Sequence, residues 1–312
     1  MRHYTTIFFG TQEFAAIILQ GLIDSPLFTI ALVVTQPDKP MGRKKIITPP
    51  ITKVLAEKHS IPVAQPLSLK GFDLSPYPAD IAIVAQYGKI IPEELLSIPT
   101  YQTLNVHTSL LPKYRGASPI QSAIMNGDTT TGVTIMQMNA GLDTGPIISQ
   151  RPISIGTNET YPELERRLAR LSTELLLETV PDYINGTLLP KKQDEKLATH
   201  CSQLTREDGQ IDWRNTATKV YNQYRGMTPW PGIWTLWGEK RLKLLDIAVS
   251  EKHVPPGTVL AEDGTLYIGC STGAVQIHLV QLEGKPRMDV RAFLMGNANI
   301  NGAILLSPPP LT

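Results

Sequence analysis

Cysteine is scarce in this chain: only Cys201 and Cys270 occur among its 312 residues. They lie far apart and match no spacing of paired metal ligands, so we expect neither a metal site nor a disulfide framework. Two separate, reduced thiols are typical of a cytoplasmic protein, and a cytoplasmic location is therefore expected.

Signatures of several other protein classes are also missing. Gly10 ends a strand-like run, but no Gly-x-Gly-x-x-Gly follows it and no Gly-Lys-Ser/Thr phosphate loop occurs, which argues against a nucleotide cofactor. No segment approaches the roughly 20 apolar residues of a membrane helix. Thr11, Gln12 and Glu13 interrupt the apolar start of the chain too early for a signal peptide.

The chain also lacks an excess of charge of either sign. Its formal net charge is +1, so the molecule as a whole does not attract nucleic acid. DNA is not an expected partner, and any contact with RNA must come from a local basic patch.

What the chain does contain, in its first half, is an alternation of strand-like and helix-like segments. This pattern predicts an α/β domain with a Rossmann-like parallel sheet and helices on its faces. The expected strands are 6–9, 29–35, 81–85 and 104–106, followed by paired strands 133–138 and 146–155. The expected helices are 12–22, 50–59, 118–125 and a long one from Pro162 that ends before Asn185.

The second half reads differently. Residues 190–205 mix proline with charged and amide side chains, which suits a linker between a catalytic domain over residues 1–189 and a C-terminal domain over residues 206–312. Short strand-like pieces separated by turns predict a small β-barrel in the C-terminal domain. These pieces are 234–237, 242–248, 257–261, 266–270 and 274–282.

Three polar side chains stand where strands of the first domain end. Asn105 and His107 are two residues apart on one strand and so share a face. Asp143 lies in a turn between the two paired strands. Ligands bind at the carboxyl edge of an α/β sheet. An amide donor, an imidazole and a carboxylate suit attack on a carbonyl carbon, because one group can stabilise the oxyanion while the others move the proton.

Each of these residues by itself has a simpler interpretation. A lone buried histidine is more often a satisfied core residue than a catalyst, and Asp143 between glycines can be an ordinary turn residue. Asp-Thr-Gly at residues 143–145 also matches aspartic proteases, which need two facing carboxylates. The chain has no second Asp-Thr-Gly, so this third interpretation is set aside.

The sequence around these residues decides between these interpretations, because it resembles the folate-dependent formyltransferases. The likeness to the methionyl-tRNA formyltransferase family runs nearly end to end. The matching segments are 8–15, 35–43, 87–92, 105–107, 109–116, 118–121, 131–138, 141–145, 211–213 and 229–231. The chain departs from the family pattern at Gln12, where proline is usual, and at Gln86, where a small residue is common.

The resemblance implies a fold and a reaction. The C-terminal barrel would be of the oligonucleotide-binding type, contacting tRNA, and the chain would act as a monomer. The enzyme would move the formyl group of 10-formyltetrahydrofolate to the α-amino group of methionyl initiator tRNA for translation initiation. Asn105 would bind the oxyanion, and His107 would bind the same oxygen or protonate the leaving nitrogen. Asp143 would orient His107 and take the proton of the amine, although the residues leave open which of the two moves each proton.

The resemblance also implies contacts with both substrates. The family's folate-binding segment matches Ser109, Leu110, Leu111 and Pro112, where an apolar wall with exposed backbone groups would face a flat pterin. Tyr87 and Gly88 are expected to line the same cleft.

A cluster of cations between residues 36 and 53 is the expected tRNA contact. Prolines bar a regular helix there, so we expect an exposed loop between a strand and a helix. In the resembling family this insertion reaches the acceptor end of tRNA, and the residues concerned would be Lys39, Arg43, Lys44 and Lys45. Arg115 and Lys113 either add phosphate contacts or brace the site.

Three other functions would use some of the same residues. A formyltransferase of a small-molecule amine would keep Asn105, His107 and Asp143 without needing the basic insertion. A formyltetrahydrofolate hydrolase would use water as the acceptor. A non-catalytic RNA-binding module predicts aromatic residues among the cations, whereas the four tryptophans lie in the second half of the chain.

Overall fold

The alternating segments of the first half form a seven-stranded sheet. The computed structural model describes residues 3–42 and 44–309. The strands of this sheet are β1 (Tyr4–Gly10), β2 (Phe28–Val34), β5 (Val63–Ala64), β6 (Ile81–Ala85), β7 (Thr103–His107), β9 (Thr130–Gln137) and β10 (Ile147–Ser154). Their order is β10-β9-β7-β6-β1-β2-β5. The five strands from β7 to β5 run parallel, as expected, while β9 and β10 continue the sheet antiparallel.

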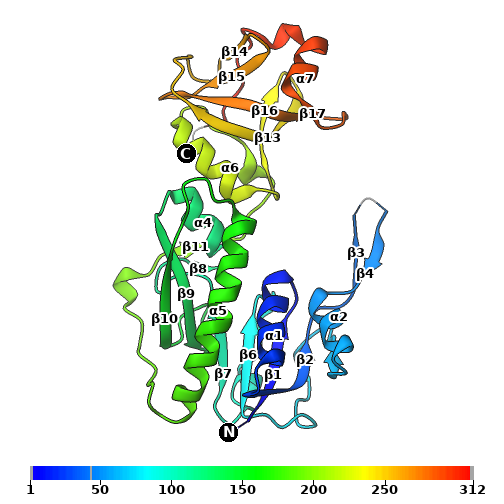
Figure 1. Cartoon of the computed structure of the whole chain (residues 1–312), viewed down its shortest axis with the longest axis vertical. Coiled ribbons are helices and arrows are strands. Elements are labelled where there is room, and N and C mark those ends of the chain that lie inside the picture. Colours follow the sequence, from blue (N-terminus) through cyan, green and yellow to red (C-terminus); the bar gives the residue numbers. More distant parts are fainter. Residues whose placement is uncertain (1–2, 43, 310–312) are drawn as a thin grey trace. The chain divides into compact units, whose positions relative to one another are not determined.

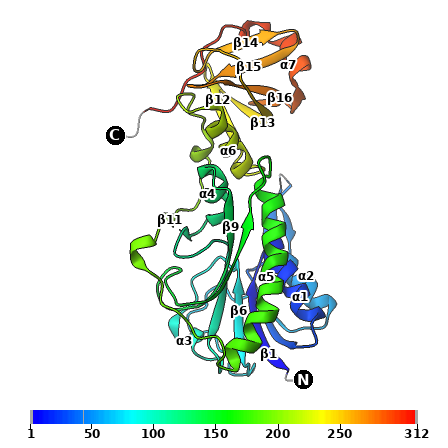
Figure 2. The ribbon, with the colours of Figure 1, turned by 60° about the vertical axis from the view of Figure 1, so that its left-hand side comes forward.

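The sheet is covered on both faces, because its strands carry apolar side chains on both sides. All five residues of β6 are buried. The helices α1 (Glu13–Asp24) and α5 (Tyr161–Ile184) lie next to each other (Figure 2), and the close approach of Gly21 to Thr173 joins them. On the other face, Ile7 and Phe9 pack against loop residues and against α3 (Glu93–Leu96).

The predicted helices begin within two residues of their expected starts. The remaining helices of this half are α2 (Ile51–Lys58) and α4 (Pro119–Asn126). Helix α5 ends before Asn185, as predicted, and it continues through Pro181. Leu164, Leu168 and Leu175 of α5 are buried, so the helix turns an apolar face to the interior.

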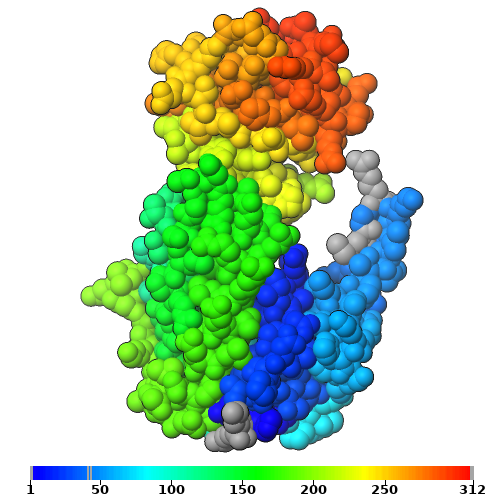
Figure 3. Space-filling model, viewed as in Figure 1, coloured from blue at the N-terminus to red at the C-terminus, as the bar shows by residue number. Residues whose placement is uncertain are grey.

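The prediction of a simple loop between β2 and α2 is wrong. This segment forms a two-stranded hairpin of β3 (Lys39–Met41) and β4 (Ile46–Thr48), which stands out from the sheet (light blue in Figures 1 and 3). Proline at position 40 fits because the hairpin has only edge strands. Arg43 lies outside the described residues.

The second half contains an antiparallel sheet, as predicted. Its strands are β12 (Ile233–Trp237), β13 (Lys240–Ser250), β14 (Val259–Glu262), β15 (Thr265–Gly269), β16 (Ala274–Leu282) and β17 (Met288–Asp289). Isolated bridges join Ile304 to Thr258, next to β14, and Leu306 to Leu236 on β12. The segment 304–306 therefore links the two edges of the sheet, as closure toward a barrel requires.

Two helices of the second half escaped prediction. They are α6 (Ala217–Met227) and α7 (Val290–Gly296), and short 3-10 turns occur at Glu207–Gly209 and Ala298–Ile300. Both helices contribute buried residues to the core of the antiparallel sheet, among them Val220 and Phe293.

The chain folds into two units whose boundaries cut across the sequence. The first comprises the described parts of Met1–Pro119, Thr130–Ser154 and Leu164–Cys201. The second comprises Ile120–Thr129, Ile155–Glu163 and the described part of Ser202–Thr312. Residues 190–201, which open the predicted linker, belong to the first unit. No described helix has the length and apolar character needed to span a bilayer.

Candidate active site

The carboxyl edge of the first sheet gathers the predicted polar residues. Asn105 and His107 lie at the carboxyl end of β7, which runs between β6 and β9. Asp143 lies in the turn between β9 and β10, and β9 is paired with β7. The sheet order therefore brings residues 38 positions apart in sequence to one edge.

The three side chains converge on the carboxylate of Asp143. The Nδ2 atom of Asn105 is 3.4 Å from Oδ1 of Asp143, and Nδ1 of His107 is 3.6 Å from Oδ2. The backbone N–H of Gly116 donates to the same Oδ2 at 2.9 Å. The side chains of His107 and Asp143 are 6% and 12% exposed. The carboxylate thus touches the amide through one oxygen and faces the imidazole with the other, with little access for bulk water.

The orientation of the His107 ring determines which nitrogen faces the site. Its Nε2 lies 2.9 Å from the carbonyl oxygen of Tyr114, and a carbonyl can only accept a hydrogen bond. Nε2 must therefore carry a proton. The remaining nitrogen, Nδ1, faces Asp143 and is the atom through which His107 can exchange a proton.

The Asp143 turn has a tightly constrained backbone. Asp143 adopts a left-handed conformation with φ of 53°, which aspartate tolerates better than most residues. A Cβ atom at Gly145 would lie 1.8 Å from the carbonyl oxygen of Gln137. Asn139 Oδ1 accepts hydrogen bonds from Gly141 N–H and from the Thr144 hydroxyl. A Cβ atom at Gly141 would lie 2.1 Å from the Thr144 hydroxyl oxygen, so close approach favours glycine at both 141 and 145.

The predicted folate segment, residues 109–112, is more enclosed than expected. The Ser109 and Leu111 side chains are buried, and the Ser109 hydroxyl donates to the carbonyl of Lys113. All four carbonyls accept internal hydrogen bonds, from Thr134, Lys113, Gln150 and Thr199. Each carbonyl of the expected backbone surface therefore already has a donor inside the protein. The half-buried surfaces of Leu110 and Pro112 are what this segment can present to a ligand.

The turn after β6 carries the other predicted cleft residues. The Tyr87 ring packs edge-on against Phe9 in the core and is 1% exposed, and this burial raises the pKa of its hydroxyl to about 12. The expectation that the Tyr87 side chain lines a cleft is therefore wrong. Its carbonyl accepts from the Thr11 hydroxyl and from Gln36 Nε2, and Gly88 beside it is exposed with φ of 78°.

The two departures from the family pattern lie in different environments. Gln12 is exposed at the start of α1 and makes no side-chain capping bond. Gln86 has a φ of 43°, and its Nε2 donates to Glu165 at 3.2 Å. Within the described residues, Gln86 Oε1 is buried and has no hydrogen-bond partner.

The cations of the hairpin are exposed at Lys39, Lys44 and Lys45. Lys39 donates to Gln36, and the acidic residue of this segment, Asp38, is paired with Lys53 at 2.9 Å. Hydrogen bonds from Gln65 and Lys53 lower the pKa of Asp38. Because Asp38 is neutralised locally, the hairpin presents a positive surface.

Arg115 and Gln193 support the Asp143 turn, and of these the sequence singled out only Arg115, as a residue that either contacts phosphate or braces the site. Arg115 is buried, and its guanidinium bonds to Gln193 and Glu195, so it braces the interior and is not presented to phosphate. Gln193 was included in the expected linker. It carries no local signal, because its partners are about 50 and 80 residues away in sequence.

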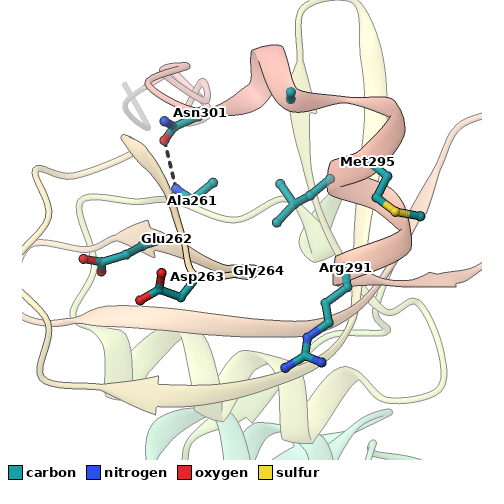
Figure 4. Close-up of a pocket in the computed structure, with 9 residues that line it drawn as sticks. Ala261, Glu262, Asp263, Gly264, Arg291, Met295 and Asn301 are labelled. Carbon is teal, nitrogen blue, oxygen red and sulfur yellow. Dashed lines mark hydrogen bonds between the residues drawn. The ribbon is translucent and has the colours of Figure 1, made fainter.

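The second unit contains a concavity of about 520 Å³. Glu262, Asp263, Arg291, Met295 and Asn301 are among its lining residues (Figure 4). Asn301 Oδ1 accepts a bond from the Ala261 N–H, and Glu262 is paired with Lys252. None of the predicted site residues lines it.

The described residues contain no cluster of three or more side chains that could hold a metal ion. Cys201 and Cys270 are both free thiols. Burial raises the pKa of Cys270 to about 12, which makes it an unreactive core residue.

The sequence matches known proteins over nearly its whole length. Residues 3–180 match the Formyl transferase family and residues 203–298 match the Formyl transferase C-terminal domain. The methionyl-tRNA formyltransferase of Caldicellulosiruptor saccharolyticus is 42% identical over 309 residues, covering 96% of this chain and 99% of that protein. The methionyl-tRNA formyltransferase of Geotalea daltonii is 44% identical over 308 residues, covering 96% and 97%.

Solved structures share the fold at lower identity. HypX from Aquifex aeolicus, in complex with tetrahydrofolic acid, superposes with a TM-score of 0.62 at 19% identity, over 94% of this chain and 47% of that one. An N-formyltransferase from Helicobacter canadensis, in complex with folinic acid and dTDP-3-aminofucose, gives a TM-score of 0.65 at 19% identity, over 89% and 98%.

Proposed function

The chain belongs to the methionyl-tRNA formyltransferase family, and from that premise we propose how it works. It transfers the formyl group of 10-formyltetrahydrofolate to the α-amino group of methionine on initiator tRNA, in the cytoplasm and as a monomer. The observation that carries the proposed site is the convergence of Asn105, His107 and Asp143 at one sheet edge.

Asn105 is the proposed oxyanion donor. Attack of an amine on a formyl carbon places negative charge on the formyl oxygen. One N–H of the Asn105 amide reaches Asp143, which leaves the second N–H of the same group for that oxygen. A preorganised donor of this kind typically contributes about 100- to 1000-fold in rate.

Asp143 and His107 are the proposed proton carriers. The amine must lose a proton as it attacks, and the carboxylate of Asp143 can accept it. The folate nitrogen leaves after it gains a proton. His107 holds one proton on Nε2 toward Tyr114, so a proton that it passes on travels through Nδ1, the atom that faces Asp143. A positioned acid–base group contributes about 100- to 10,000-fold.

The residues around the trio fit a folate. Leu110 and Pro112 offer half-buried apolar surface to a flat ring, and the unpaired Oε1 of Gln86 suits an N–H donor of a ring or an amine. Bound there, the folate supplies the formyl group. Ser109 and Leu111 act by holding the segment in place, since their side chains are buried.

The hairpin is the proposed contact for tRNA. Lys39, Lys44 and Lys45 are exposed on it, and Arg43 lies between them in sequence. Cations held away from neutralising carboxylates suit the phosphate backbone, which supplies most of the sequence-independent affinity for nucleic acids. A small-molecule formyltransferase would not need this surface.

One assay tests the proposal against its alternatives. The purified chain is incubated with 10-formyltetrahydrofolate and charged initiator tRNA, with elongator methionyl-tRNA, free methionine and no acceptor as controls. We expect formylmethionyl-tRNA from the initiator and little product from the others. Formate release without an acceptor would instead identify a hydrolase, and formylation of free amines at equal rates would remove the role of tRNA.

A further inference from the structure

A glutamine from the segment that precedes the second unit holds the backbone of the Asp143 turn. The Nε2 atom of Gln193 donates to two carbonyls of that turn, of Asp143 at 2.8 Å and of Gly145 at 2.7 Å. Its Oε1 accepts from Arg115 Nε at 3.0 Å and from Nη2 at 2.8 Å. The side chain is 4% exposed, so all four bonds form in a water-poor interior, where they are stronger and their loss is more costly.

Arg115 is held in turn by an exposed carboxylate. Its guanidinium, 2% exposed, donates to both oxygens of Glu195 at 2.8 and 2.9 Å, and the Glu195 side chain is 62% exposed. The hydrogen bonds that Arg115 donates to Glu195 raise the pKa of Arg115, so the group stays cationic. We call Arg115, Gln193 and Glu195 the brace.

The brace acts on Asp143 from two directions. Gln193 holds the backbone carbonyls on either side of Thr144, while Gly116, next to Arg115 in β8 (Arg115–Gly116), donates its N–H to the Asp143 carboxylate. Strand β8 pairs with β11 (His200–Cys201), and a Cβ at Gly116 would lie 2.1 Å from the carbonyl oxygen of Cys201. The segment 190–201 thus supports Asp143 twice: Gln193 binds its main chain directly, and β11 pairs with the strand whose Gly116 binds its side chain.

We propose that Gln193 is a positioning residue for the reaction, and that it acts through Asp143. This inference rests on the proposed function of that carboxylate. Asp143 occupies a left-handed conformation that L residues rarely adopt. The two bonds from Gln193 keep the Asp143 carboxylate directed at Asn105 and His107.

The chemistry of the brace requires an amide at position 193. The group must donate to two carbonyls and accept from a cation at the same time, which an amide does and a carboxylate does not. Glutamate has nearly the same shape and would still accept from Arg115. It would, however, place an acceptor oxygen against the carbonyls of Asp143 and Gly145. Gln193→Glu is therefore a nearly isosteric change that breaks only the contacts with the turn.

The test compares Gln193→Glu with Asp194→Ala in the full chain. Asp194 is the next residue and is exposed, and its carboxylate accepts from the N–H of Lys196 at the start of the short turn Glu195–Leu197. We expect Gln193→Glu to lower kcat by about 100-fold, the size expected for a misplacement of about 1 Å. KM for folate and for tRNA should stay near the wild-type values, and Asp194→Ala should retain wild-type kcat.

A double-variant cycle separates positioning from general destabilisation. If Gln193 acts through Asp143, adding Gln193→Glu to Asp143→Asn should cause no further loss of kcat. Equal losses in both backgrounds, or full activity of Gln193→Glu, would overturn the proposal. If Gln193→Glu does not fold, Arg115→Lys takes its place, because the single nitrogen of a lysine cannot reproduce the four bonds that the guanidinium makes to Gln193 and Glu195. Wild-type protein without formyltransferase activity would instead refute the proposed function.

Discussion

The turn that carries Asp143 and the hairpin that carries the lysines are built in opposite ways, although both are short connections with a proposed function. The Asp143 turn is held by bonds to its carbonyls, to its carboxylate and within its own side chains. The hairpin of β3 and β4 has three residue pairs between its strands and exposes Lys44 and Lys45. A two-stranded hairpin of this kind is marginally stable alone.

The difference follows from what each region is proposed to contact. A proton or a developing oxyanion must be met at a definite distance, so rigid positioning contributes to rate. A phosphate backbone is a diffuse array of charges that exposed cations can meet in many arrangements. We therefore expect changes in the turn to affect kcat and changes in the hairpin to affect the use of tRNA.

Asp143→Asn should cause the largest effect. The amide cannot accept the proton of the amine, and its N–H group would face the Asn105 amide. We expect kcat to fall by about 100- to 10,000-fold, with the melting temperature and folate affinity little changed. Single-turnover kinetics with saturating substrates measure this. An Asp143→Asn protein with wild-type kcat would show that the carboxylate does not carry the proton.

Asn105→Ala should cause the next largest effect. Loss of one oxyanion donor should lower kcat by about 100- to 1000-fold, without changing the pH at which activity is half-maximal. Asn105→Asp is the matched variant, since it keeps the shape but places a second carboxylate beside Asp143. Wild-type turnover by Asn105→Ala would remove the assignment of this donor.

How well the sequence predicts a region depends on whether the residues that shape it are close together or far apart in the chain. The strands Ile81–Ala85 and Ala274–Leu282 were predicted to the residue, because apolar runs bounded by turn residues encode strands locally. The meeting of Asn105 and His107 with Asp143 also followed from sequence, since strand ends share an edge. Their chemical roles stay predictions.

The parts that sequence could not predict depend on distant partners or on competing local signals. Gln193 stands in a polar stretch typical of a linker, and its proposed role depends on contacts with Arg115 and Asp143, far away in the chain. The sequence did not predict the hairpin of β3 and β4, because the prolines and charged residues of this segment are equally typical of an irregular loop. The Tyr87 ring was expected at the cleft, but the turn after β6 directs it into the core beside Phe9.

Lys44→Ala together with Lys45→Ala should weaken the use of tRNA while leaving the chemistry intact. We expect a higher KM for tRNA and an unchanged kcat. The slope of log affinity against log salt should become shallower by about 1 to 2, because each phosphate contact contributes about 0.7 to 0.9. Lys70→Ala, an exposed lysine outside the hairpin, is the control. A salt slope equal to that of the wild type would place the tRNA contact elsewhere.

Glu195→Gln should have the smallest effect and should show which part of the brace matters. Gln193 still contacts Arg115 in this variant, so kcat should stay close to the wild-type value, in contrast to Gln193→Glu.

The same variant also tests the ion pair between Arg115 and Glu195. The hydrogen bond from Arg115 lowers the pKa of Glu195 below its usual 4.5. A carboxylate with a depressed pKa adds stability above its unfolded-state pKa and loses it as the pH falls through the folded-state value. The free energy of unfolding should therefore differ slightly between wild type and variant at pH 7, and the difference should shrink below about pH 4.5. Denaturant unfolding at both pH values measures it, and a difference that did not depend on pH would mean that the carboxylate does not pair with Arg115.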